Sequence, residues 1–287
     1  MLNSLQNELT RLGVSCDAPA IIRSQNGVTV ARVSNGGESC ILKFFERPEF
    51  RREIEAYRLL GSLGVPTIRV LAHTDSALLL EDLSASPRWR LAEAGDMADC
   101  ELAERLAEWY VCLHARGREY VRAHGGGLYD ETDAFTRENL ALAREKTDTH
   151  ALPIWDALER RYDDLRARLD HAERTLTYND FYYTNMAVAR DRSAACMFDY
   201  NLLGKGFASS DLSNVTSSLS KEAGEVFLRA YDRPIDPAER ALNDVMSVLV
   251  GLIFACQREH FPSWGNACLA ELQNGFEEKI ARLCDHA

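Results

Sequence analysis

Apolar and polar residues alternate along the first part of the chain with a period of two, which is typical of β-strands. In the segment ESCILKFF, this period places Cys40, Leu42 and Phe44 on one face of a strand and Lys43 on the other. Strands are predicted at residues 20–23, 28–34, 38–45, 68–72 and 77–83. A helix that begins near Pro48 is predicted between the third and fourth strands, so this part is expected to form a small α+β lobe.

Beyond residue 87, apolar residues recur at helical spacing. Helices are predicted at residues 98–116, 134–146, 155–175, 222–231, 236–260 and 266–285, and Gly117 is expected to end the first of them. The run Ser84 to Pro87 marks a change of composition, so we expect two domains, residues 1–84 and residues 85–287. The longest apolar stretch, residues 245–256, is too short for a bilayer and is predicted to be a core helix.

Lys43 is flanked by apolar neighbours in its strand, which is unfavourable unless the ammonium is paired or binds an anion. In the helix that follows, a rotation of about 100° per residue places Glu53 near the buried face. The same rotation places Glu55 on the far side. The sequence therefore predicts an ion pair between Lys43 and Glu53.

The stretch LTYNDFYYTNMAVARDRSAACMFD, residues 176–199, combines two polar features with a buried strand. Asp180 precedes Asn185 by five positions, and an apolar run ends in Asp199. Taken alone, Asp199 is equally compatible with a turn residue at a strand end. Together the three residues have the layout of a phosphoryl-transfer site, in which Asp180 accepts the proton of the attacking hydroxyl and the other two hold Mg²⁺.

Composition narrows the function classes. The chain is 46% hydrophobic and 27% charged, as in soluble globular proteins. Its eight cysteines include no C-x-x-C pair, so we interpret them as free thiols of a reducing, cytoplasmic protein.

The formal net charge of −11 argues against a nucleic-acid partner and suits a cationic ligand. We see no secretory signal and expect no membrane partner; the sequence does not indicate an oligomeric state.

The ordered set of strand lysine, inward glutamate, strand-linker junction and Asp-Asn-Asp resembles the protein-kinase-like fold. More narrowly, residues from about 20 to about 232 resemble the aminoglycoside phosphotransferase and choline kinase family. The resemblance implies an α+β fold of two lobes, a small β-rich N-terminal lobe and a larger, mainly helical C-terminal lobe. It also implies an ATP- and Mg²⁺-dependent enzyme that phosphorylates a hydroxyl of a small molecule.

By this resemblance, Lys43 in CILKFF holds the α and β phosphates, and Glu53 in RREIEAYRLL pairs with it. LLLEDL corresponds to the hinge, where backbone groups from Glu81 to Leu83 meet adenine. Ser24, in the short SQNG turn, is expected to lie near the phosphates. The predicted nucleotide-binding residues are therefore Ser24, Lys43, Glu53, Glu81 and Leu83.

YNDFYYTN corresponds to the family's catalytic loop, with Asp180 as the base, and Asn185 and Asp199 as the metal ligands. FASSDLSNV resembles the segment whose aspartate, here Asp211, braces that loop. Tyr178 is also predicted to support the loop.

The sequence departs from the family pattern at several positions. The family usually has histidine where Tyr178 stands, and Asn179 is closer to choline kinases than to antibiotic kinases. SQNG replaces a fuller glycine-rich loop, and no acidic residue follows Asp199 closely. The loss of the usual histidine at Tyr178 is the main feature that favours one alternative, a catalytically silent protein that binds a nucleotide or a partner. The intact Lys43, Asp180, Asn185 and Asp199 favour an active kinase instead. A protein kinase is disfavoured because no A-P-E signature follows Asp199.

The identity of the acceptor stays open among choline, an aminoglycoside, a sugar and another amino-alcohol. Tyr182 and Tyr183 flank the predicted base, so we expect at least one to line the acceptor pocket; the alternative is that both pack beneath the loop. The acidic net charge and these aromatic rings favour an acceptor that carries a positive charge.

Overall fold

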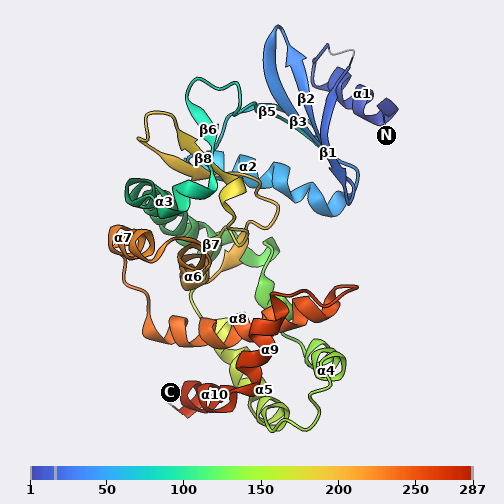
Figure 1. Cartoon of the computed structure of the whole chain (residues 1–287). Coiled ribbons are helices and arrows are strands. Elements are labelled where there is room, and N and C mark those ends of the chain that lie inside the picture. The colour runs from blue at the N-terminus through green and yellow to red at the C-terminus, as the bar shows by residue number, and fades with distance from the viewer. Residues whose placement is uncertain (1, 16–17, 286–287) are drawn as a thin grey trace. The chain divides into compact units, whose positions relative to one another are not determined.

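The computed structural model describes residues 2–15 and 18–285 (Figure 1). The fold is α+β, with a small antiparallel sheet and a larger set of helices, as the sequence predicted. Contacts divide the chain into two compact units. The first unit contains Met1–Gly117, Tyr178–Leu203 and Asn214–Asp232, and the second contains Arg118–Thr177, Gly204–Ser213 and Arg233–Ala287. The division at residues 84 and 85 stays a prediction.

The first unit contains a five-stranded antiparallel sheet in the order β1-β2-β3-β5-β4. Its strands are β1 (Ala20–Gln25), β2 (Val28–Asn35), β3 (Glu38–Phe45), β4 (Val70–His73) and β5 (Ala77–Glu81). β1 lies at one edge of this sheet, and β3 lies in the middle, paired with β2 and β5. The five predicted strands are therefore confirmed, with small shifts at their ends.

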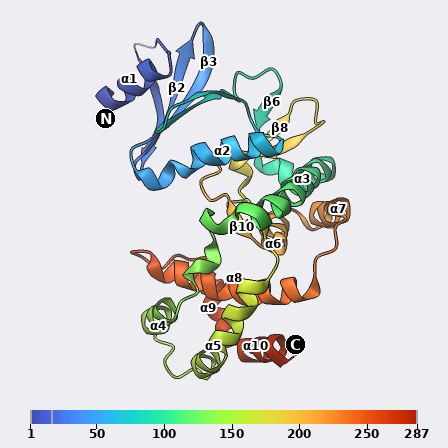
Figure 2. The same cartoon turned by 180° about the vertical axis from the view of Figure 1, so that it is seen from behind.

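Helices flank the sheet, as Figures 1 and 2 show. On one face, Leu5 and Leu9 of α1 (Leu2–Arg11) pack with Leu42 and Phe44 of β3 in an apolar cluster. On the other face lies α2 (Arg52–Leu63), which follows the 3₁₀ turn η1 (Pro48–Phe50) and ends at Gly64 in a left-handed conformation. The alternation predicted for β3 is confirmed, because its even-numbered residues face α1 and Lys43 faces α2.

The remaining elements of the first unit include those of the stretch 178–199. A second sheet has the order β6-β8-β9, and α7 contacts η2. These elements are β6 (Trp89–Leu91), η2 (Ala94–Ala98), η5 (Tyr183–Asn185), β8 (Met186–Ala189), β9 (Ala195–Met197) and α7 (Lys221–Tyr231). β9 is the buried strand predicted before Asp199.

The second unit is mainly helical, with a two-stranded sheet of β7 and β10. Its apolar centre is α8, which packs against α4, α9 and α10, so the predicted core helix is confirmed. The elements are η3 (Gly125–Gly127), η4 (Glu131–Ala134), α4 (Arg137–Lys146), α5 (Ile154–His171), β7 (Thr175–Thr177), β10 (Gly204–Gly206), α8 (Pro237–Gln257), α9 (Gly265–Gln273) and α10 (Phe276–Asp285). Two further helices, α3 (Cys100–His124) and α6 (Ala208–Ser218), begin in one unit and end in the other.

Three predicted helices differ from the structure in extent. The helix predicted at 155–175 ends at His171, and Thr175 lies in β7. α3 continues through the buried Gly117 to His124, because one glycine inside a helix costs only about 1 kcal/mol relative to alanine. The helix predicted at 266–285 is two helices, α9 and α10, which are separated at Asn274 and at Gly275 with φ +76°. None of the described helices combines the length and apolar character needed to cross a bilayer.

Candidate active site

Lys43 lies at the centre of a three-residue charged cluster in the first unit. Its Nζ atom is 2.6 Å from Oε2 of Glu53 on α2 and 2.7 Å from Oδ1 of Asp199 after β9. The side chain of Glu53 is fully buried, whereas Glu55 pairs with Arg58 and is mostly exposed. The ion pair predicted from strand alternation and helix phase is therefore confirmed.

Burial and charge act in opposite directions on this cluster. Burial raises the pKa of Glu53 to about 7; the Lys43 charge opposes this rise, and the Asp199 charge adds to it. Burial alone would lower the pKa of Lys43, but the two carboxylates outweigh it and raise that pKa above its usual value. Lys43 therefore stays an ammonium at neutral pH and can attract an anion.

The backbone before Asp199 is fixed by two hydrogen bonds. Phe198 donates its N–H to the carbonyl of Asn185 at 2.9 Å, and its carbonyl accepts the hydroxyl of Tyr178 at 2.5 Å. Asp199 itself has φ +62°, a left-handed conformation that is uncommon outside glycine. These contacts direct its carboxylate toward Lys43. Tyr178 is fully buried, and its predicted role in supporting the loop stays a prediction.

Asp180 and Asn185 are brought together by the loop between them. The Asn185 Nδ2 atom lies 3.3 Å from both the carboxylate and the carbonyl of Asp180. With its nitrogen directed at Asp180, the amide oxygen of Asn185 is left to accept or to ligate. Burial and the Asp199 charge raise the pKa of Asp180, while Lys43 and Asn185 oppose the rise. A carboxylate with a raised pKa is suited to accept a proton near neutral pH.

These side chains line two cavities of the first unit. The larger, of about 400 Å³, is lined by Lys43, Asn185 and Asp199 and also by Glu81 and Leu83, which are predicted to belong to the hinge. The smaller, of about 250 Å³, is lined by Lys43, Asp180 and Asp199 together with residues of β1 and β2. Hence four of the five predicted nucleotide residues face the larger cavity: Lys43, Glu53, Glu81 and Leu83.

Ser24 is the exception. Its hydroxyl lies 3.0 Å from that of Thr29, a buried residue on β2, and Ser24 lines neither cavity. Its neighbours on β1, Arg23 and Gln25, line these cavities instead. The sequence could not show which of these neighbours faces inward.

Asp82 is a cavity residue that sequence reasoning missed. Its carboxylate is almost fully buried. It accepts hydrogen bonds from the side chains of Arg32 at 2.6 Å, Ser39 at 2.7 Å and Ser84 at 2.6 Å. Burial would raise its pKa, but these donors outweigh burial and lower the pKa to about 2. Asp82 thus ties β2 and β3 to the segment that follows β5. The available signal was an aspartate directly after a buried strand.

The predicted acceptor residues are exposed. Tyr182 is 63% exposed and Tyr183 is 38% exposed, so the alternative in which both pack beneath the loop does not hold. Their role toward an acceptor stays a prediction. Asp211 lies in the first turn of α6, in the second unit, and is 1% exposed.

Asn185 and Asp199 fit a magnesium ion that also binds phosphate oxygens. Mg²⁺ commonly takes one or two protein carboxylates and completes its shell with substrate phosphates and water. The Asp199 carboxylate is 37% exposed, it shares the larger cavity with Asn185, and the amide oxygen of Asn185 is not used by Asp180. Among residues 2–15 and 18–285, no group of three or more His, Cys, Asp or Glu side chains is arranged to hold a metal ion.

A sheet lobe with a buried lysine–glutamate pair and an Asp-Asn-Asp set defines a protein-kinase-like phosphotransferase. Residues 21–242 match the phosphotransferase enzyme family, and the chain belongs to that family. It is therefore an enzyme that transfers a phosphoryl group to a hydroxyl of a small molecule. A search of curated protein sequences finds no match.

Solved structures share the fold at low sequence identity. The choline kinase LicA from Streptococcus pneumoniae is 13% identical with a TM-score of 0.64, over 98% of this chain and 99% of that chain. The macrolide 2′-phosphotransferase MphH from Brachybacterium faecium is 19% identical with a TM-score of 0.59, over 95% of this chain and 98% of that chain. A spectinomycin phosphotransferase in complex with ADP and spectinomycin is 10% identical with a TM-score of 0.53, over 98% of both chains.

Proposed function

We propose that this enzyme transfers the γ-phosphate of ATP to a hydroxyl of a small, cationic acceptor, with Mg²⁺ as the metal. The observation that carries the proposal is Lys43, held between Glu53 and Asp199 in a cavity that also includes the hinge and Asn185. This arrangement supports a binding mode in which the base of the nucleotide lies at the predicted hinge and its phosphates contact Lys43.

Each residue has a separate role in the proposed reaction. Lys43 binds the phosphate oxygens, and Glu53 fixes the position of its ammonium. Asp180 accepts the proton of the acceptor hydroxyl, which its raised pKa supports. Asn185 and Asp199 would hold the metal, which when bound neutralises charge on the phosphates.

The similar proteins support nucleotide use but differ in their acceptors. The spectinomycin phosphotransferase was solved with ADP, and LicA was also solved with AMP. Choline, macrolides and spectinomycin have different skeletons, so the acceptor of this chain is inferred from charge. The net charge of −11 favours a cation over an anion.

A phosphotransfer screen tests the proposal. Purified enzyme with ATP and Mg²⁺ would be given choline, ethanolamine, aminoglycosides, macrolides and neutral sugars, and ADP release and phosphorylated product would both be measured. We expect acceptor-dependent ADP release with at least one cationic hydroxyl compound. ATP binding without turnover on any acceptor would instead favour the catalytically silent alternative.

A further inference from the structure

The hairpin between β1 and β2 is too tight to wrap around phosphates. Gln25 pairs with Val28, so only Asn26 and Gly27 connect the strands, with φ +55° and +80°. Such a two-residue turn leaves no stretch of free loop whose N–H groups could surround an anion, as a longer glycine-rich loop can. Anion binding beside this hairpin therefore falls to side chains of the strands.

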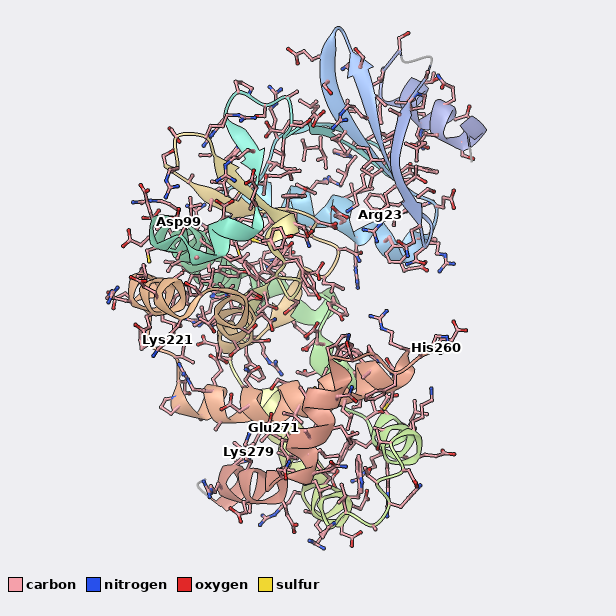
Figure 3. All side chains as sticks on the ribbon, viewed as in Figure 1. Arg23, Asp99, Lys221, His260, Glu271 and Lys279 are labelled. Atoms are coloured by element: carbon pink, nitrogen blue, oxygen red, sulfur yellow. The ribbon has the colours of Figure 1, made fainter. Side chains whose placement is uncertain are left out.

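Arg23 is the strand residue best placed for that task. It lies on β1 (Figure 3) and lines both the larger and the smaller cavity. The smaller cavity also includes Lys43, Asp180 and Asp199, the residues expected beside the transferred phosphate. Gln25, two positions along the same strand, faces this cavity too.

The charge of Arg23 is not compensated. Three basic side chains line the two cavities, and two of them are paired with carboxylates: Lys43 with Glu53 and Asp199, and Arg32 with Asp82. The third, Arg23, donates to the neutral Gln25 side chain at 3.0 Å. Across residues 2–15 and 18–285, no carboxylate pairs with Arg23. Its guanidinium is therefore available to an anionic ligand.

We propose that Arg23 binds the phosphate chain of the nucleotide and takes the place of the missing glycine-rich loop. This proposal rests on the proposed kinase function and adds a binding residue to it. A guanidinium presents several N–H donors in one plane, which matches phosphate oxygens, and Gln25 orients that plane. Lys43 contributes a point charge from β3, so the phosphates are bound from two strands.

The test compares Arg23→Gln with Arg58→Gln. Both variants remove one positive charge from an exposed arginine, but Arg58 pairs with Glu55 on α2 and lines neither cavity. Calorimetry in the presence of Mg²⁺ would give Kd for ATP and for adenosine, and thermal unfolding would monitor the fold. We expect Arg23→Gln to weaken ATP binding about tenfold and adenosine binding less than twofold. Arg58→Gln should change neither, and Arg23→Lys should recover part of the loss.

Each other outcome overturns the assignment. An exposed arginine on an edge strand can also serve only to prevent strand pairing between molecules, and Arg23→Gln would then bind ATP like the wild type. Equal losses for ATP and adenosine would mean that Arg23 acts on the base or on the fold. If the wild type binds ATP and Arg23→Gln binds it equally well, the assignment of Arg23 is wrong and the kinase proposal stands. If the wild type binds no nucleotide phosphate, both proposals fall.

Discussion

Asp199 combines an unusual backbone conformation with the most exposed carboxylate of the charged cluster. Its φ of +62° costs on the order of 1–3 kcal/mol, and the hydrogen bonds of Phe198 to Asn185 and Tyr178 hold it in place. The result is a carboxylate that contacts Lys43 and still reaches the larger cavity. A residue that served only as a turn would not need to point at a buried ammonium.

The first prediction concerns this carboxylate. Asp199→Ala should abolish the Mg²⁺ dependence of ATP binding, because Asn185 alone offers too few oxygen ligands. Calorimetry of ATP with and without Mg²⁺ checks it. Glu104→Ala, which removes an exposed carboxylate from α3, serves as the control. An Asp199→Ala protein with the metal dependence of the wild type would show that Asp199 has only a structural role.

Asp180 is expected to act on the chemical step rather than on binding. Asp180→Asn should lower kcat by about 10²–10⁴-fold and leave the Kd of ATP nearly unchanged. Burial raises the pKa of Asp180, so the base becomes protonated earlier when the pH is lowered. As pH falls, activity of the wild type should therefore begin to decrease at a pH above the ordinary aspartate pKa of 3.8. Steady-state kinetics across pH measure both effects, and a variant with near-normal kcat would remove Asp180 from the role of base.

Glu53 makes stability depend on pH in an unusual direction. A carboxyl whose pKa is about 7 when folded and 4.5 when unfolded binds more protons in the folded state, so its contribution to stability falls as pH rises between these values. Relative to Glu53→Gln, the wild type without nucleotide should lose about 2–3 kcal/mol of unfolding free energy between pH 5 and pH 8. Chemical denaturation of both proteins measures the difference. A difference that is constant over this range would mean that Lys43 keeps Glu53 ionised throughout.

At the scale of elements, strand alternation and helix phase predicted which residues meet, whereas helix ends and turn geometry escaped prediction. Lys43 and Glu53 were predicted as partners because both patterns are periodic and local. Gly117 was expected to end α3, but burial within the helix outweighs its low propensity. The partners of Asp82 and Ser24 were not predicted, because they depend on which strand lies beside each residue in the sheet.

The network around Asp82 links three elements, so its loss should be felt in both stability and binding. Asp82→Asn should cost about 1–2 kcal/mol at pH 7, a modest value because Arg32 is half exposed. The folded pKa of about 2 lies below the unfolded value of 3.8, so this stabilisation is present above pH 3.8 and is lost as pH falls toward 2. Urea denaturation at pH 7 and pH 3 checks both statements, with Glu104→Gln as the control. A pH-independent difference would contradict the charge-based account.

At the scale of the whole molecule, the order of the motifs identified the family although identity to similar structures is between 10% and 19%. A phosphoryl-transfer site needs few groups, and their order follows from the fold. The acceptor site has no such constraint, because hydroxyl compounds of many shapes can be brought to one base. The net charge of the whole chain is the property from which we infer the class of acceptor.

The last prediction is therefore electrostatic. A chain with a net charge of −11 attracts cations over distances that salt screens, with a Debye length of about 10 Å at 0.1 M. The best acceptor should carry both a hydroxyl and a positive charge, and its KM should rise several-fold between 50 and 300 mM salt while kcat changes little. Tyr182→Ala and Tyr183→Ala should raise the same KM where the exposed ring contacts the cation, by about two- to fivefold. A neutral or anionic best acceptor with a KM indifferent to salt would refute the electrostatic argument and leave the kinase assignment in place.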